Sequence, residues 1–238
     1  MRINQYLATA NYCSRREADR LVAAGKVQIN GRPAKLGDQV TETDRVFVDG
    51  QLIQIKTDKT YLAFNKPVGV IVTTDRSARN NILDAINYPK RIFPVGRLDV
   101  ASSGLILLTD DNSIVEPILR SKKIEKEYFV EVGRNLTGDF LEHLARGVII
   151  PARHATQGVT GGDGYKTLPA KTKKIGNRQF NITIVEGKNR QIRRMCEALG
   201  YNVRKLTRIR IGNILMNNLK PGKYIKLSSQ TIKTLLKF

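Results

Sequence analysis

Hydrophobic positions in the first 25 residues follow the spacing of α-helices. Over residues 3–10 the apolar side chains recur every three or four positions, which predicts a short helix. Ser14 and Glu17 then form a capping-box pattern, because a serine hydroxyl and a glutamate carboxylate three residues later can satisfy free N–H groups at a helix start. A second helix is therefore expected from this box to Gly25, a residue type that commonly ends helices.

Strand spacing replaces helical spacing after that glycine. A short apolar segment at 27–29 precedes Asn30-Gly31, and another at 46–53 is interrupted by Asp49-Gly50. Both dipeptides favour tight turns between antiparallel strands. Residues 1–56 are thus expected to form a small domain of two helices followed by short strands.

The remainder, residues 57–238, alternates strand-like and helical segments and is expected to form a second, larger domain. Segments rich in β-branched and aromatic residues, typical of strands, lie at 61–64, 68–73, 105–108, 128–132, 180–185 and 224–227. Helices are expected over 139–145 and after Asn189, where an apolar stripe beginning at Ile192 ends before Gly200. Cys196 belongs to this stripe, so we expect its thiol in the core. Residues 158–169 form a turn-rich loop.

Composition excludes several classes of site. The two cysteines, Cys13 and Cys196, lie far apart, and His143 and His154 are the only histidines, so neither a disulfide framework nor a zinc site is expected. Glycine-rich nucleotide-binding motifs are absent, so neither ATP nor a dinucleotide is implied. No apolar run approaches the ~20 residues that span a bilayer, and no secretory segment follows Met1. We therefore expect a cytoplasmic protein that binds no membrane, metal or cofactor.

The charge is strongly positive. Lys and Arg total 41 against 21 Asp and Glu, a formal net charge of +20, which favours a polyanionic partner such as nucleic acid. Residues 1–56 hold nine of the basic and six of the acidic side chains, a net charge of +3, which leaves +17 for residues 57–238. Residues 166–210 alone hold 13 basic and 2 acidic side chains. Most of the positive field therefore lies outside the small N-terminal domain.

Three stretches could carry chemistry, and the residues alone leave each of them open. Asp99, two residues after Arg97, is either a turn residue or a carboxylate kept ionised by a cation for nucleophilic or base catalysis. Arg193 flanks the apolar stripe of its helix and can point along the core boundary into a cleft, although a general phosphate-binding face is the alternative. Tyr128 is either a packing residue of its strand or a platform for an extruded base.

The N-terminal stretch "CSRREADRLVAAGKVQINGRPA" resembles the S4 domain, an RNA-binding module first recognised in a small-subunit ribosomal protein. From the residues alone, the early arginines, including Arg2, fit an RNA-facing surface and a merely solvated helix face equally well. The resemblance implies that Arg15, Arg16 and Lys26 contact RNA phosphates.

The remainder resembles the RsuA-type pseudouridine synthases, which modify ribosomal RNA. The resemblance is carried by "NKPVG" from residue 65, "GRLD" from residue 96, Lys126 with Tyr128, and "NRQIRRM" from residue 189. The wording "NRQIRRMCEALGY" is most similar to the RluF branch, whose members act on large-subunit rRNA. The loop at 151–168 fits the family pattern poorly.

The resemblance also implies roles for single residues. Asp99 would be the catalytic carboxylate, Arg193 its ion-pair partner, Tyr128 the ring that stacks on the uracil, and Arg97 the residue that helps extrude the uridine. Leu206 and Ile192 would line the substrate pocket. Further RNA contacts are expected from residues that flank these motifs, namely Gly96, Leu98, Arg190, Gln191, Arg194, Val203, Arg204, Lys205 and Arg208.

The implied fold class is α+β: a small helix-rich S4 domain, then a catalytic domain with a central, mainly antiparallel mixed sheet, flanking helices and a basic cleft. The implied function is isomerisation of uridine to pseudouridine in ribosomal RNA, with a 23S rRNA stem-loop as the expected substrate and a tRNA as a further one, by a monomer. Asp99 would act either by attacking the anomeric carbon or by removing a ribose proton. The rival hypotheses are a non-catalytic ribosome-assembly factor and an S4-fused RNA methyltransferase.

Overall fold

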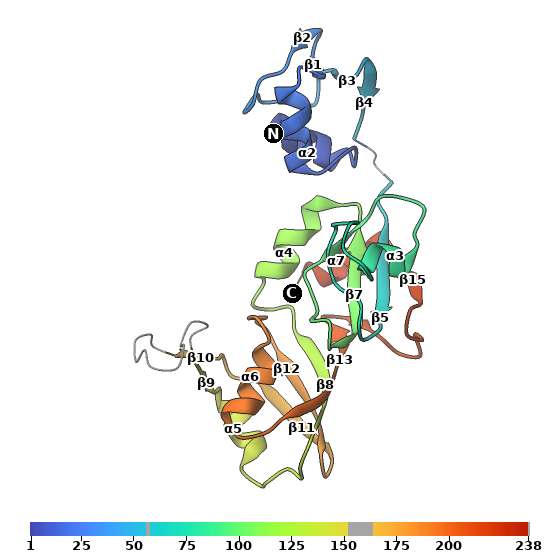
Figure 1. Ribbon diagram of the computed structural model, residues 1–238. Coiled ribbons are helices and arrows are strands. Elements are labelled where there is room, and N and C mark those ends of the chain that lie inside the picture. Colours follow the sequence, from blue (N-terminus) through green and yellow to red (C-terminus); the bar gives the residue numbers. More distant parts are fainter. Residues whose placement is uncertain (56–57, 152–163, 238) are drawn as a thin grey trace.

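The computed structural model describes residues 1–55, 58–151 and 164–237, so the first half of the turn-rich loop expected at 158–169 lies outside the described residues. A small N-terminal unit stands beside a larger body built on one long sheet (Figure 1). Each unit has its own apolar core, one formed by residues 3–53 and two formed within residues 62–235. No helix in the described ranges is both long and apolar enough to cross a membrane.

The N-terminal unit follows the predicted order of elements. Its helices are α1 (Ile3–Thr9) and α2 (Arg15–Ala23), and its antiparallel strands are β1 (Val27–Ile29), β2 (Arg32–Pro33), β3 (Val46–Val48) and β4 (Gln51–Ile53), in sheet order β2-β1-β3-β4. The predicted cap is present, because Ser14 Oγ accepts a hydrogen bond from the Glu17 N–H at 3.1 Å. Few polar contacts between described residues join this unit to the body. The Asn11 side chain donates to the Arg91 carbonyl and accepts from the Arg91 guanidinium, and Asn112 Nδ2 donates to the Ala8 carbonyl at 3.0 Å.

The body contains a sheet of nine strands. Its continuous path is β11-β12-β8-β13-β7-β5-β15, with β14 paired to β13 and β6 paired to β7. These strands are β5 (Tyr61–Lys66), β6 (Phe93–Val95), β7 (Ser103–Thr109), β8 (Lys126–Val132), β11 (Lys171–Gly176), β12 (Gln179–Ile184), β13 (Val203–Ile211), β14 (Ile214–Leu215) and β15 (Tyr224–Lys226). Every pairing between these strands is antiparallel except that of β7 with β13. The α+β class with a mainly antiparallel mixed sheet is therefore confirmed.

Helices cover the sheet on two sides. They are α3 (Ile82–Ile86), the 3₁₀ turn η1 (Asn112–Ile114), α4 (Val115–Arg120), α5 (Phe140–Arg146), α6 (Gln191–Ala198) and α7 (Ser229–Leu235), and a separate pair of short strands is β9 (Ile149–Ile150) with β10 (Tyr165–Lys166). Helices α3, α5 and α6 contribute to one apolar core, whereas η1, α4 and α7 contribute to the other. Cys196 of α6 is fully buried as predicted, and burial raises the pKa of its thiol to about 12.

One predicted strand is wrong. Residues 68–73 hold only an isolated bridge between Ile71 and Asn81. The chain curls here because the buried Lys66 ammonium draws in two carbonyls, those of Pro67 at 2.7 Å and Val70 at 2.9 Å. Gly69 permits the curl with a φ of 90°, in the left-handed region that favours glycine.

Candidate active site

Asp99 lies in the loop between β6 and β7, and its neighbours hold this loop in place. The Ser102 N–H donates to the Asp99 carbonyl at 3.0 Å, and the Gly69 N–H donates to the Val100 carbonyl at 2.8 Å. Burial lowers the pKa of the Lys66 ammonium to about 8, while the Asp99 carboxylate opposes that shift. The curl at 66–70 is therefore the support on which the Asp99 loop rests.

The half-buried Asp99 side chain faces a cavity of about 180 Å³. Tyr128 of β8, Ile192 of α6 and Leu206 of β13 also line this cavity, so the structure brings these predicted site residues together with Asp99. The three apolar or aromatic ones are at most 7% exposed. Asp99 is the single carboxylate among the described lining residues, whereas the cations are Arg97, Lys126, Lys188, Arg190 and Arg208.

Arg193 forms hydrogen bonds with the loop that carries Asp99, but not with the Asp99 carboxylate. Its Nη2 donates to the Ala101 carbonyl at 2.8 Å and to Ser102 Oγ at 3.3 Å, and its Nη1 donates to the Val203 carbonyl at 3.1 Å. No ion pair with Asp99 within 4.0 Å is present in the described residues, so the direct pairing expected from the resemblance is not found in this structure. The physical reason is that the carbonyls of Ala101 and Val203 and the hydroxyl of Ser102 already occupy the two terminal nitrogens of the guanidinium. The Asp99 charge still acts on Arg193 through space, opposing the burial that lowers the arginine pKa.

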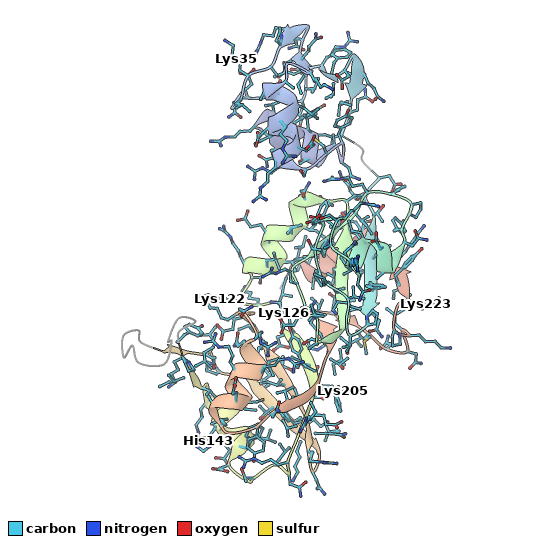
Figure 2. The ribbon with its side chains drawn as sticks, viewed as in Figure 1. Lys35, Lys122, Lys126, His143, Lys205 and Lys223 are labelled. Carbon is cyan, nitrogen blue, oxygen red and sulfur yellow. The ribbon has the colours of Figure 1, made fainter. Side chains whose placement is uncertain are left out.

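Two buried cations, Arg208 and Lys126, lie beside Tyr128. Arg208 is 5% exposed, its Nε donates to the Leu105 carbonyl at 2.6 Å, and its Nη2 has no hydrogen-bond partner in the described residues. Lys126 is 8% exposed and its Nζ reaches two carbonyls only at 3.4 Å. Burial lowers the Lys126 pKa, and the Arg208 charge lowers it further. Figure 2 shows Lys126 in the middle of the body, in contrast to Lys223 at its edge.

A β-bulge places Arg208 and Arg210 on opposite faces of β13. Arg208 pairs with Tyr128, but Arg210 pairs with Glu127, because the register shifts between the two arginines. Strict alternation would put both on one face. We call the face of β8 and β13 that holds Lys126, Tyr128 and Arg208 the pocket face.

The opposite face, which holds Glu125, Glu127 and Arg210, is called the outer face. There Arg210 Nη2 lies 2.9 Å from a Glu125 oxygen, and Arg210 Nε lies 2.9 Å from a Glu127 oxygen. Lys171 adds a second cation at 2.6 Å from Glu125. Unlike those of the pocket face, the outer-face cations are therefore neutralised.

Gly104 sets how closely β7 approaches β13. A Cβ atom built at this glycine would lie 2.3 Å from the Arg208 carbonyl oxygen, and its φ of 106° disfavours other residues. The close approach allows the parallel register in which Gly104 faces Arg208 and Ser103 faces Thr207. Gly104 thereby brings the Asp99 loop, which β7 follows, next to the strand that carries Arg208.

The other predicted RNA-contacting residues separate into two groups. Those that line the cavity are Gly96, Arg97, Leu98, Arg190, Gln191 and Arg208. Gln191 is buried and bonds Glu186 at 2.6 Å, so it fixes its own loop. Those that lie off the cavity lining are Arg194, Val203, Arg204, Lys205 in the body and Arg2, Arg15, Arg16, Lys26 in the N-terminal unit. Arg194 donates to the Pro151 carbonyl, and Lys26 lies 3.6 Å from Asp49.

Lys126 and Lys188 were not predicted as site residues. A charged residue at a buried position of an alternating strand, two before Tyr128, is the signal that could have identified Lys126. Lys188 follows Gly187 in the loop before α6 and has no comparable signal. No group of three or more His, Cys, Asp or Glu side chains that could hold a metal ion occurs in residues 1–55, 58–151 and 164–237.

Comparison with known proteins agrees with this geometry. The family model "RNA pseudouridylate synthase" matches residues 60–198, and the S4 domain model matches residues 1–46. The dual-specificity RNA pseudouridine synthase RluF of Escherichia coli strain K12 is 42% identical over 240 residues, which cover 100% of this chain and 79% of that protein. The ribosomal large subunit pseudouridine synthase B of Yersinia pestis is 35% identical, with 95% of this chain and 72% of that protein covered.

A solved structure is similar over the whole chain. It is a crystal structure of a pseudouridylate synthase, 28% identical, with a TM-score of 0.69 and 99% of both chains covered. The family match covers more than half of the chain and includes Asp99, Tyr128 and Arg193. The chain therefore belongs to the RNA pseudouridylate synthase family, in the branch that contains RluF, and carries an S4 domain at its N-terminus.

Proposed function

We propose that this enzyme converts a uridine in a stem-loop of large-subunit (23S) ribosomal RNA into pseudouridine, with a tRNA as a second substrate. The observation that carries the proposal is the cavity in which Asp99 is the single described carboxylate among cations, beside a buried tyrosine. A site that merely bound RNA would gain nothing from a carboxylate facing a polyanion. The names of the relatives, one of dual specificity and one acting on the large ribosomal subunit, support the choice of substrate.

In the proposed reaction, the bond between uracil N1 and ribose C1′ breaks and a bond between uracil C5 and C1′ forms. Asp99 either attacks C1′ and is later displaced, or removes a ribose proton and later returns it. In both routes the electron pair of the broken bond leaves with the uracil, and the proton lost from C5 ends on N1. The isomerisation is balanced without an oxidant, a metal or a cofactor.

The remaining site residues receive positions in this scheme. The target base leaves its stack, at an energetic cost of a few kcal/mol, and enters the cavity against Tyr128, with Ile192 and Leu206 around it. Arg97, exposed at the cavity mouth, fills the gap left in the RNA. Arg193 is a positioning residue, since it holds the carbonyl of Ala101 and the hydroxyl of Ser102 directly after Asp99.

We assign residues 1–56 to an S4 domain that docks the RNA and residues 57–238 to the catalytic domain. Exposed Arg2, Arg15, Arg16 and Lys26 of the first domain are available for phosphate contacts. Exposed cations at the cavity within the basic stretch at 166–210, namely Lys188 and Arg190, supply the corresponding contacts there. We expect the enzyme to act as a monomer in the cytoplasm.

The decisive experiment uses ribosomal RNA that lacks pseudouridine. Wild-type enzyme, Asp99→Asn and the control Asp139→Asn, whose carboxylate lies in the body away from the cavity, are each incubated with this RNA, and pseudouridine is mapped along it. We expect one or few large-subunit sites with the wild type and the control, and a loss of at least about 10⁴-fold in rate with Asp99→Asn. Modification that persists in Asp99→Asn would remove the residue from its role. Binding without modification by the wild type would favour an assembly factor.

A further inference from the structure

The pocket face holds two buried cations that the proposed roles above do not use. Arg208 and Lys126 are both more than nine-tenths buried and both line the cavity beside Tyr128. Neither has a carboxylate partner in the described part of the chain. Their positions follow from the register, because Arg208 lies opposite Tyr128 and Lys126 lies two residues before it on the same face of β8.

An uncompensated buried cation opposes folding. Buried polar groups are normally hydrogen-bonded and buried charges normally paired, since removing a charge from water is expensive. Within the described residues, Arg208 Nη2 has no partner and Lys126 Nζ has only two long contacts of 3.4 Å. Two like charges in one apolar surrounding also repel each other. An anion that forms in the cavity would pair with both buried cations and would also reduce the repulsion between them.

The position of the two cations selects the kind of anion. The guanidinium of Arg208 lies 6.0 Å from the centre of the Tyr128 ring, so it is within reach of a base placed against that ring. Apolar side chains, among them Ile184, Ile192 and Leu206, line the same cavity. Phosphates of the RNA backbone can bind the exposed cations at the cavity mouth, namely Arg97, Lys188 and Arg190. The two buried cations are therefore left for an anion that forms inside the cavity.

We propose that Arg208 and Lys126 stabilise the negative charge that develops on the uracil when its bond to ribose breaks. This inference rests on the proposed function. As the C1′–N1 bond cleaves, its electron pair stays on N1 and spreads to the carbonyl oxygens O2 and O4 of the ring. N–H groups of the two cations donate to these oxygens, so the charge is stabilised more strongly in the detached uracil than in the bound uridine. When C5 bonds to C1′ and N1 takes up the proton that C5 loses, the ring is neutral again and its hold on the cations weakens.

Such preorganised donors act on the rate because they are already desolvated and fixed in place before charge develops. Arg208 is fixed by its 2.6 Å bond to the Leu105 carbonyl, on the strand that follows the Asp99 loop. Asp99 and the two cations then work at opposite ends of the breaking bond: the carboxylate at C1′ of the sugar, the cations at the oxygens of the base.

The test compares two leaving bases. RNA carrying either uridine or 5-fluorouridine at the mapped target is treated under single-turnover conditions with wild type, Arg208→Met, Lys126→Met and the outer-face control Arg210→Met. Disappearance of the target nucleoside is followed in nuclease digests. Fluorine on C5 withdraws electrons and stabilises the uracil anion, so the fluorinated base depends less on the protein for charge stabilisation.

We expect Arg208→Met to slow the uridine reaction by about 10²- to 10³-fold and the 5-fluorouridine reaction by about tenfold less than that. Lys126→Met should show the same smaller loss with the fluorinated base, and Arg210→Met should react like wild type. RNA affinity should stay within about threefold in all variants. Arg208→Lys, which retains a cation, should recover much of the rate, and it replaces Arg208→Met in the comparison if the latter does not fold.

Equal losses for the two bases would overturn the inference, as would a loss of RNA affinity that accounts for the slower rate. Failure of the proposed function is distinguishable, since a wild-type enzyme without activity on ribosomal RNA would give no target to compare.

Discussion

The pocket face and the outer face of β8 and β13 use the same residue types in opposite ways. On the outer face, Arg210 lies 2.9 Å from oxygens of both Glu125 and Glu127, and this pairing raises the Arg210 pKa despite burial. On the pocket face, Arg208 has one carbonyl acceptor and an Nη2 without a partner in the part of the chain that the structure describes. On the outer face the ion pairs stabilise the fold, whereas the cations of the pocket face remain available to bind a ligand.

The difference originates in one irregularity of the backbone. Both arginines belong to β13 and both are paired with residues of β8, but the bulge between them places their side chains on opposite faces of the sheet. A charged residue's contribution therefore depends on which side of a sheet it lies, and on what the facing strand offers there. Arg210 lies opposite a carboxylate and stabilises the fold. Arg208 lies opposite Tyr128 and acts in the reaction.

The largest effect is expected when β13, whose two faces are compared above, is forced away from the neighbouring strand β7. Gly104→Ala would place a Cβ atom 2.3 Å from the Arg208 carbonyl oxygen at a φ of 106°, so β7 and β13 must move apart. We expect the free energy of unfolding to fall by about 3 to 4 kcal/mol and activity to be lost with it. Chemical denaturation measures the first effect. Gly138→Ala, where a Cβ meets nothing within 4 Å, is the control, and equal stability of the two variants would contradict the role of this close approach.

A smaller effect, on stability alone, is expected on the outer face. Arg210→Met leaves the Glu125 and Glu127 carboxylates without this cation in a partly buried position, and we expect a loss of about 2 kcal/mol of unfolding free energy. The rate of pseudouridine formation at a temperature where the variant is folded should be unchanged. A loss of activity without a loss of stability would show that the two faces are not divided as described.

The smallest expected effect has the opposite sign and depends on pH. Lys126→Met removes a buried, weakly bonded cation, so near neutral pH the unfolding free energy should rise by about 1 kcal/mol although activity falls. Because the folded-state pKa of Lys126 lies below its ordinary value, the unfolded wild type binds more protons between the two values. Wild-type stability therefore increases with pH through that window, and the advantage of the variant shrinks there. Urea denaturation of both proteins from pH 7 to 10.5 measures this, and a constant or growing advantage would contradict it.

Much of the fold could be predicted because local signals and tertiary structure agree. The capping box at Ser14 and the apolar stripe of α6 are short-range patterns, and each forms the expected helix. The strand expected at 68–73 failed because Lys66, itself buried, draws the following carbonyls toward its ammonium. A propensity-based prediction does not include such a long side chain folding back on its own backbone.

The site was harder to predict than the fold, for a related reason. Asp99, Tyr128, Leu206 and Ile192 were recognisable by motif, and they line one cavity. The position of Arg193 depends on a loop 92 residues away in sequence, and that of Arg208 depends on a bulge. An alternating pattern encodes neither. Lys126 was recognisable only as part of the motif with Tyr128, and its burial beside Arg208 follows from the strand register, which the motif does not encode.

The parallel pairing of β7 with β13 also determines when the enzyme becomes complete. Its contacts, such as the 3.0 Å hydrogen bond between Ser103 Oγ and Thr207 Oγ1, join residues 104 positions apart. Contacts between distant residues form slowly, because the intervening chain loses much entropy when they close. During synthesis, the S4 unit and β5 leave the ribosome long before β13 exists. We therefore expect a nascent chain that can already hold RNA but has no cavity in which to react, with catalysis beginning only after its last quarter has emerged.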